Sequence, residues 1–481
     1  MSNQAKILVG LIILYIIVFG LVSCFRHYNF QTQTWDMGVF VQTFWNTVHG
    51  RVMFNNLEEA DHHFGVHMSP WLFVLVPGYA IFSSPYYLLI IQTIFLGLAA
   101  WPLYLLAVKI LENRNQALLV ALSYLLYPSL HWINLFDFHE IAFFIPLFLA
   151  AFYFFEKRKY LWSLIFFLAS ASTKENAILA VAFAGIYLFL RKSREDKFIF
   201  LKKWTIKKDK FFGTAIFFIC LIFFIVSIKF IMPALGGGLL RFDRYANLGN
   251  SPSEIITNIS QNPSILTETI LEKSKLVYFM WVFLPVAFLP FFVLLPWLLI
   301  FPGLLQNMLT SFGSQFSGLY QYDAVIIPAV FIALVFALKK IKLRWPKMKK
   351  PAVAVLIVCM SIAFFSRSPV SPFVFPIDLF KTRQRWQVFR QMVKRVPEEV
   401  SVSAHTNLVP HLSQREHAYQ LGQEDFLVDV VLFDRQNFFG FASIHDFQDY
   451  IDSYLNSGEY EVEVIEERYA IIYRKKVELD Y

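Results

Sequence analysis

The chain has 481 residues, of which 57% are hydrophobic and only 16% charged, and Phe alone occurs 54 times. Soluble domains are about one quarter charged, so this composition excludes an ordinary soluble protein and favours helices that face lipid. The net charge of +8 does not indicate a nucleic-acid partner, because the Lys and Arg residues cluster between apolar segments, as in cytoplasmic loops under the positive-inside rule.

The first apolar segment, 5–25, is predicted to be an uncleaved transmembrane helix. A long outer loop follows over residues 26–85. Its apolar part 69–83 is short and contains Pro77 and Gly78, so it is predicted to be half-buried or interfacial rather than a span. Further spans are predicted at 86–108, 116–132, 140–155, 160–173, 177–190, 211–232, 274–288, 290–306, 324–338 and 351–367.

The basic connections predict the orientation of these spans. The strongest are Arg191–Lys210 and Lys339–Lys350, and smaller ones lie at Lys109–Arg114 and Glu156–Lys159. Placing all four in the cytoplasm gives about eleven crossings. The expected protein is therefore a multi-pass protein of the cell membrane, with a cytoplasmic N-terminus and an extracytoplasmic C-terminus.

The composition changes after Pro376, where charge becomes ordinary and apolar runs shorten. Residues 1–376 are therefore predicted to form an all-α polytopic membrane domain. Residues 377–481 are predicted to form a small extracytoplasmic α/β domain. Its expected helices are Lys381–Arg395 and His445–Asn456, and its expected strands are Val400–Ala404, Val428–Asp434, Tyr460–Glu466 and Tyr469–Arg474.

With this orientation, the polar residues near the span ends fall mostly on the outer face. Ionisable groups at membrane depth are costly and mark candidate functional sites. Asp36 precedes an amphipathic segment that ends near Gly50, and two interpretations stay open: it caps a surface helix, or it is a base that faces a cavity. His67 follows the pair His62 and His63, whose spacing fits no standard zinc motif.

Three further clusters lie on the same predicted face. Asp137, His139 and Glu140 are either metal- or pyrophosphate-binding groups or a solvated loop. Lys174 either neutralises Glu175 or holds a phosphate as a point charge. Tyr320 and Tyr322 favour a membrane-interface belt, and Asp323 follows them. We expect several of these clusters to converge on one cavity, lined by Asp36, His67, Asp137 and Lys174.

The sequence resembles the predicted membrane proteins known as domain of unknown function 2079, which in turn resemble the GT-C superfamily of membrane glycosyltransferases. The resemblance rests on five segments: Asp36–Gln42, Gly65–Pro70, Asp137–His139, Lys174–Glu175 and Pro410–Arg415. It implies a polyprenyl-phosphate sugar donor, a first acid at the position of Asp36 and a second at that of Asp137. Many superfamily members carry paired acids in the first motif, whereas Met37 follows Asp36 here.

The sequence and this resemblance together give a functional hypothesis. A glycosyltransferase would use Asp36 as its general base and a divalent cation, Mg²⁺ or Mn²⁺, held by Asp137. The substrate- or phosphate-binding residues would be Gln42, His67, His139, Lys174 and Glu175. The alternatives are a transporter or lipid flippase that uses the same polar cavity, and a scaffold whose outer domain binds a partner. The chain has no Walker-type phosphate loop, which argues against ATP-driven work.

Overall fold

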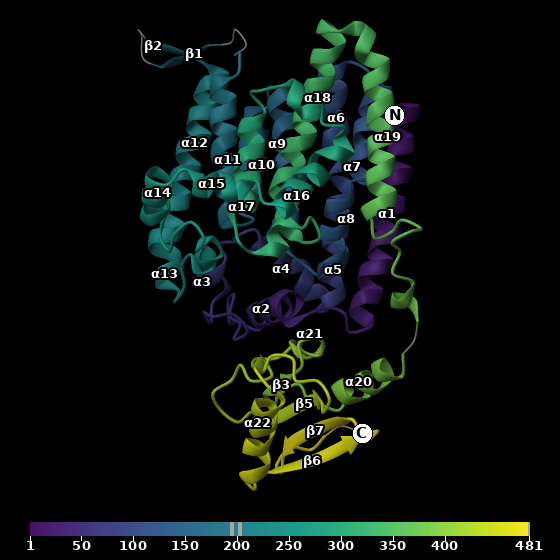
Figure 1. Cartoon of the computed structure of the whole chain (residues 1–481), viewed down its shortest axis with the longest axis vertical. Coiled ribbons are helices and arrows are strands. Elements are labelled where there is room, and N and C mark those ends of the chain that lie inside the picture. Colours follow the sequence, from purple (N-terminus) through teal and green to yellow (C-terminus); the bar gives the residue numbers. More distant parts are fainter. Residues whose placement is uncertain (193–196, 201–203, 382, 480–481) are drawn as a thin grey trace.

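The computed structural model describes residues 1–192, 197–200, 204–381 and 383–479. A long helical bundle carries a smaller sheet-bearing part at one end (Figure 1). The N-terminus and the turn between helices α18 (Ile326–Arg344) and α19 (Lys349–Arg367) lie at the opposite end. The basic stretch 339–350 is therefore remote from the sheet. The basic stretch 191–210 lies only partly within the described residues, and its short hairpin of β1 (Lys197–Phe200) and β2 (Trp204–Lys207) is also at that far end.

Among the described residues, five helical stretches are long and apolar enough to cross a membrane: Asn3–Tyr28, Pro85–Leu111, Lys208–Ala234, Gln321–Arg344 and Pro346–Arg367. Helices α7 (Arg114–Leu125) and α8 (Pro128–Leu135) form a sixth if they count as one span bent by 45°. The break falls at Pro128, which begins α8. Proline lacks the backbone N–H that would hydrogen-bond to the preceding turn and continue α7. The chain is thus a multi-pass membrane protein by helix length and composition.

Every predicted span contains helix, but the prediction of about eleven crossings is not confirmed. The remaining bundle helices are too short to qualify by length: α4 (Leu72–Ile81), α9 (Phe144–Glu156), α10 (Tyr160–Ala171), α11 (Glu175–Leu190), α16 (Lys273–Phe283) and α17 (Trp297–Leu309). The predicted turn near 285–290 is present as two 3₁₀ turns, Leu284–Val286 and Leu289–Phe292. The segment 69–83 contains only the ten-residue α4, which rises about 15 Å and does not span a bilayer.

The sheet-bearing part has five strands in the order β4-β3-β5-β7-β6. Strands β3 (Val402–Ala404), β4 (Ala418–Gln420) and β5 (Val430–Asp434) are parallel, and β6 (Tyr460–Ile465) and β7 (Tyr469–Arg474) complete the sheet as antiparallel neighbours. Helices α20 (Gln384–Lys394) and α22 (Ile444–Asn456) match the two predicted helices. The sequence patterns missed β4 and the one-turn helix α21 (Val409–Leu412).

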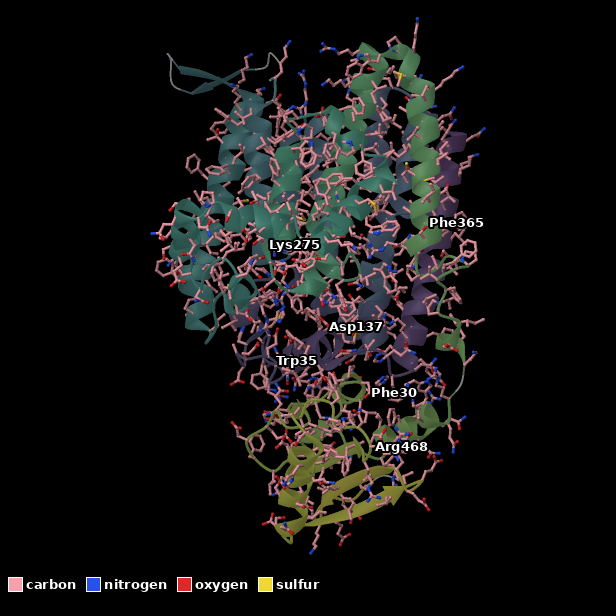
Figure 2. The ribbon with its side chains drawn as sticks, viewed as in Figure 1. Phe30, Trp35, Asp137, Lys275, Phe365 and Arg468 are labelled. Carbon is pink, nitrogen blue, oxygen red and sulfur yellow. The ribbon has the colours of Figure 1, made fainter. Side chains whose placement is uncertain are left out.

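The first outer loop joins the bundle to the sheet. It contains the π-helical turn η1 (Thr34–Gly38) and helices α2 (Val39–Val48) and α3 (His63–Val66). Phe30, Val39 and Leu57 of this loop belong to the same apolar core as the sheet, and Figure 2 shows Phe30 and Trp35 at the junction. Thr34 also donates its backbone N–H to Thr406 Oγ1 at 3.2 Å. The outer loop therefore packs against the sheet-bearing part as well as against the bundle.

Candidate active site

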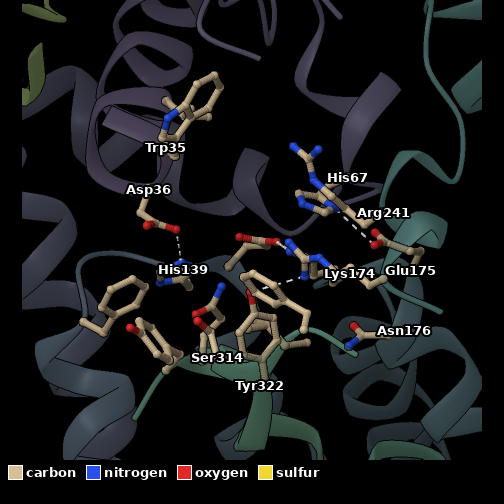
Figure 3. A pocket seen from close by; sticks show the side chains of 18 of the residues that line it. Trp35, Asp36, His67, His139, Lys174, Glu175, Asn176, Arg241, Ser314 and Tyr322 are labelled. Carbon is tan, nitrogen blue, oxygen red and sulfur yellow. Dashed lines mark hydrogen bonds and ion pairs between the residues drawn. The ribbon is translucent and has the colours of Figure 1, made fainter. Parts of the chain in front are cut away.

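Asp36 lies in η1 and does not cap a helix. Gly38 occupies the N-cap position of α2, and no side chain accepts a capping hydrogen bond there. The capping interpretation of Asp36 is therefore wrong. Its carboxylate Oδ1 instead lies 2.8 Å from Nε2 of His139 (Figure 3), and the side chain is 21% exposed.

His139 is held in place from three sides. Its backbone N–H donates to Gln92 Oε1 at 2.8 Å, and Gln92 Nε2 donates to the carbonyl of Asp137 at 2.8 Å. The imidazole stacks on Phe136 with ring centroids 5.4 Å apart. Its Nδ1 is buried without a hydrogen-bond partner. This pattern favours the tautomer with the proton on Nε2, which donates to Asp36.

Lys174 forms an ion pair with Glu140, and not with its neighbour Glu175, which was one of the two interpretations of the sequence. Lys174 Nζ lies 2.8 Å from Glu140 Oε1, and the Glu140 side chain is fully buried. Burial alone would raise the pKa of Glu140, but the charge of Lys174 and the nearby histidines lower it. Burial alone would lower the pKa of Lys174, and the carboxylates of Glu140 and Glu175 raise it. Both groups are therefore charged at neutral pH.

Glu175 has both carboxylate oxygens engaged. Oε1 lies 3.1 Å from His67 Nδ1, and Oε2 accepts the backbone N–H of Met68 at 3.2 Å. Glu175 thus ties the start of α11 to the end of α3. Lys174 and Glu175 are adjacent in sequence but hold two different segments of the chain.

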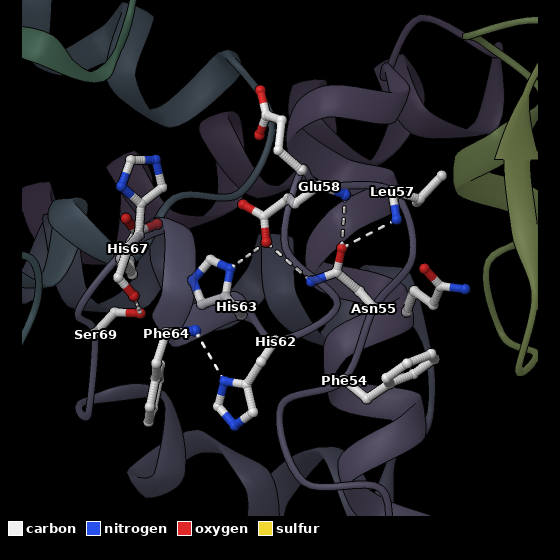
Figure 4. A network of polar contacts seen from close by, with 12 residues as sticks. Phe54, Asn55, Leu57, Glu58, His62, His63, Phe64, His67 and Ser69 are labelled. Atoms are coloured by element: carbon white, nitrogen blue, oxygen red, sulfur yellow. Dashed lines mark hydrogen bonds and ion pairs between the residues drawn. The ribbon is translucent and has the colours of Figure 1, made fainter. Parts of the chain in front are cut away.

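The His62-His63 pair is part of the scaffold behind this site. His63 Nδ1 lies 2.8 Å from Glu58 Oε2, and Asn55 Nδ2 donates to the same oxygen at 2.9 Å (Figure 4). Burial alone would lower the pKa of His63, but the Glu58 carboxylate raises it. His62 Nδ1 accepts the backbone N–H of Phe64. The two rings thus have separate partners.

A polar cavity of about 350 Å³ lies at this site. Asp36, His67, His139, Glu140, Lys174 and Glu175 all line it, and so do Tyr320 and Tyr322. Figure 3 shows Asp36, His67, His139, Lys174, Glu175 and Tyr322 around this cavity. The structure therefore brings together five of the seven site residues proposed from the sequence: Asp36, His67, His139, Lys174 and Glu175.

Two arginines that the sequence analysis did not single out also line the cavity. Both lie in the 3₁₀ turn η4 (Leu240–Tyr245). Arg241 makes a two-pronged ion pair with Glu59, at 2.5 and 2.9 Å. Arg244 stacks over Phe312, with its guanidinium carbon 4.4 Å from the ring centroid, and donates to the Tyr322 hydroxyl at 3.2 Å. Within the described chain Arg244 has no carboxylate partner.

An apolar cavity of about 370 Å³ adjoins the polar one. The two share His67, Glu175, Asn176, Arg241 and Gln306 as common wall. The apolar cavity extends from there between α11, α12 (Lys208–Val226), α17 and η4, and its other walls include Leu179, Phe183, Phe224, Leu239, Pro302 and Leu305. An amphiphilic molecule would find a charged region and an apolar region side by side.

Asp137 and Gln42 do not line the polar cavity, so the expectation that Asp137 shares it is wrong. Asp137 Oδ2 accepts the backbone N–H of Gln33 at 2.9 Å, and Oδ1 lies 3.5 Å from Arg26. Burial raises the pKa of Asp137 to about 6, although Arg26 opposes the shift. Gln42 Nε2 donates to Asn56 Oδ1 and to the carbonyl of Glu416. Asp137 thus holds the start of the outer loop, and Gln42 connects the outer loop to the sheet-bearing part.

The residues around Asp137 do not fit a divalent cation. Its carboxylate already accepts an N–H and faces the positive charge of Arg26, which would repel a cation bound there. Across the residues that the structure describes, no group of three or more His, Cys, Asp or Glu side chains is arranged to hold a metal ion.

The fold and the cavity define a multi-pass membrane protein with a polar site at the sheet-bearing end. Residues 26–469 match the family described as "Predicted membrane protein (DUF2079)", and the chain belongs to that family. No curated protein matches the sequence significantly.

The chain is also similar to solved structures of ArnT from Cupriavidus metallidurans. With the structure bound to undecaprenyl phosphate it shares 10% identity and a TM-score of 0.47, over 96% of this chain and 97% of that one. With the apo structure it shares 11% identity and a TM-score of 0.48, over 96% and 98%. No residue role is transferred from ArnT at this level of similarity.

Proposed function

We propose that the protein is a membrane glycosyltransferase that moves a sugar from a polyprenyl-phosphate donor to a hydroxyl acceptor on the outer face of the membrane. The observation that carries the proposal is the adjoining pair of cavities, one charged and one apolar, with a shared wall. A lipid-linked sugar phosphate has the matching chemistry: an apolar tail, an anionic phosphate and a polar sugar. We place the cavity on the outer face because the basic stretch 339–350, which the positive-inside rule assigns to the cytoplasm, lies at the end of the molecule remote from the cavity.

Asp36 is the best placed general base among the carboxylates of the cavity. A base needs an oxygen that is free to take the proton. Glu175 has both oxygens occupied, and Glu140 is fully buried against Lys174. Glu58 is 7% exposed, and its Oε2 is bound to His63 and Asn55. Asp36 uses Oδ1 toward His139 and, within the described chain, makes no hydrogen bond through Oδ2. His139 acts as a positioning residue that fixes the orientation of the carboxylate.

The reaction is a displacement at the anomeric carbon. The acceptor hydroxyl oxygen forms a bond to that carbon, and its proton passes to Asp36. The bond from the anomeric carbon to the phosphate oxygen breaks, and its electron pair leaves with the polyprenyl phosphate. Positive charge near the leaving phosphate stabilises the transition state. Arg244, which has no carboxylate partner in the described chain, and Lys174 supply that charge in this proposal.

The apolar cavity accounts for the lipid part of the donor. Its walls are Leu and Phe side chains of bundle helices, and Arg241 stands where the two cavities meet. A polyprenyl chain in this cavity would bring its phosphate to the cationic wall of the polar cavity. The neighbouring space between Asp36 and Tyr320 would then hold the sugar, since aromatic faces such as Trp35 and Tyr320 also line that cavity.

The Asp36→Asn variant tests the proposal. Asn keeps the size of the side chain and an oxygen that accepts the His139 N–H, but it does not take up a proton. We expect turnover of a polyprenyl-phosphate sugar to fall by about a hundredfold or more, with unchanged thermal unfolding. The matched control is Asp61→Asn, an exposed acid of the same outer loop that does not line the cavity, and it should keep full activity.

The assay follows release of polyprenyl phosphate from purified protein with a panel of lipid-linked sugars. Full turnover in Asp36→Asn would remove Asp36 from the mechanism. Lipid movement across a vesicle membrane by the wild-type protein, with no release of polyprenyl phosphate from any donor, would overturn the transferase in favour of the transporter alternative.

A further inference from the structure

A basic cavity lies at the end of the bundle remote from the candidate active site. It has a volume of about 490 Å³ and is bounded by the last turns of α11 and α18 and by the loop before α17. Five of its twelve lining residues are cations: Arg191, Lys192, Lys339, Lys340 and Arg344. No acidic residue lines it within the described chain. It shares no residue with the polar cavity around Asp36.

The cations of this cavity fall into two kinds. Arg191 is structural, because it pairs with Glu156 at 2.6 Å and lies against the rings of Phe155 and Tyr187. The other four make no ion pair in the described part of the chain. Of these, Lys340 donates to the carbonyl of Phe292 at 2.8 Å, which fixes its position beside the loop before α17. Among the described residues, the cavity therefore presents four cations without an acidic partner.

The rest of the wall is apolar. Tyr187, Val293, Leu295 and Phe336 line the interior, while Leu294 and Leu343 are 87% and 70% exposed at the surface. The positive-inside rule explains why Lys and Arg gather at this end. It does not explain why four of them surround a cavity with an apolar wall. A ligand that matches both features carries a phosphate and a hydrocarbon chain.

We propose that this cavity binds an anionic phospholipid of the adjacent leaflet. The phosphate head group lies among Lys192, Lys339, Lys340 and Arg344, and the acyl chains lie along the wall of Val293, Leu294 and Leu343. Basic recesses between transmembrane helices favour anionic head groups because the charges attract and the helices exclude bulk water. The bound lipid would connect α18 to α11 and α17, and these last two helices also hold residues of the two active-site cavities.

The test compares two triple variants of the full chain by native mass spectrometry. Lys339→Gln, Lys340→Gln and Arg344→Gln together remove three cations of the cavity. The control, Lys347→Gln, Lys349→Gln and Lys350→Gln, removes the same charge from the following turn, which does not line the cavity. Each protein is titrated with phosphatidylglycerol and with phosphatidylcholine of the same chain length. Thermal unfolding in detergent verifies that both variants are folded.

The wild type should bind one phosphatidylglycerol at least tenfold more tightly than phosphatidylcholine. The cavity variant should lose affinity for phosphatidylglycerol by about a hundredfold, since each basic residue near an anionic head group contributes about fivefold. The control should keep the preference. Equal binding of the two lipids, or equal loss in both variants, would overturn the site. Full competition by millimolar inorganic phosphate would show that it takes a soluble phosphate instead of a lipid.

Discussion

At the scale of single residues, the cavity is a set of pairs whose members come from distant parts of the sequence. Asp36 meets His139, His67 meets Glu175, and Lys174 meets Glu140. The sequence singled out all six residues, because ionisable side chains at span ends stand out in an apolar chain. It did not identify which of these residues form each pair, since the pairing depends on how the helices pack.

Lys174 illustrates why the pairing was missed. Its backbone is extended, and Glu175 is already the first residue of α11. The two side chains therefore leave the chain in different directions. Arg241 and Arg244 were missed for another reason: they lie in a charged, irregular stretch with no motif around them. Only the fold shows that this stretch returns to the cavity.

The buried pair of Lys174 and Glu140 predicts a strong coupling in stability. Lys174→Met leaves a fully buried carboxylate without its cation and should cost about 3–5 kcal/mol of unfolding free energy. The double variant Lys174→Met, Glu140→Gln removes both charges and should recover most of that loss. A double-mutant cycle of unfolding in detergent measures the coupling.

The exposed pair of Lys381 and Asp378, with side chains 65% and 62% exposed, is the control for this cycle. Lys381→Met should change stability by no measurable amount, because solvent screens surface pairs. Additive losses for Lys174→Met and Glu140→Gln would contradict the buried ion pair.

At the scale of elements, three glycines fix the turn that carries the arginines. Gly238 donates its N–H to the carbonyl of Gly65 at 2.9 Å. A Cβ on Gly65 would lie 2.6 Å from the carbonyl oxygen of Leu235, and a Cβ on Gly237 would overlap the carbonyl of Gly65. The segment before η4 thus packs directly on α3, backbone against backbone.

Gly237→Ala should therefore push η4 away from the cavity. Its φ angle is not in the positive range, so the substitution tests the close approach and not backbone strain. We expect catalytic efficiency to fall by about tenfold to a hundredfold, because misplacement by about 1 Å costs that much. Steady-state kinetics with a lipid-linked sugar measure it.

Gly313→Ala is the matched control, because a Cβ there meets no atom within 4 Å and the next residue, Ser314, lines the same cavity. It should retain wild-type kinetics. Wild-type efficiency in Gly237→Ala would mean that η4 does not need this contact.

Most elements that the sequence predicted are long enough to show a periodic pattern. Helices α20 and α22 and strands β5, β6 and β7 lie within three residues of their predicted bounds. The short strand β3 was predicted within the longer segment Val400–Ala404. Strand β4 and helix α21 have three and four residues, too few for a period of two or of 3.6 to appear. Tertiary contacts create them, since β4 exists only as the parallel partner of β3.

At the scale of the whole molecule, the outer loop is as much a part of the sheet-bearing end as of the bundle. Asn56 Nδ2 donates to the carbonyl of Ala418, and Gln414 Nε2 donates to the carbonyl of Ser83. Asp36 lies in the same loop, three residues after Gln33, whose N–H bonds Asp137 of the bundle. The position of the proposed base therefore depends on contacts with both parts. Composition alone located the boundary at Pro376 and missed this interdependence.

The distribution of basic residues and the position of the cavity together predict the topology. The N-terminus and the turn at 339–350 share one end, and the polar cavity and the sheet share the other. Reporter fusions after Arg194, which lies outside the described residues, and after Lys347 should read cytoplasmic. Fusions after Asn250 and Gly422 should read extracytoplasmic. Since Asn250 follows η4 and Gly422 follows β4, the two outer fusions probe both sides of the cavity independently. If the fusions after Asn250 and Gly422 both read cytoplasmic, the cavity would face the cytoplasm and would meet donors and acceptors there.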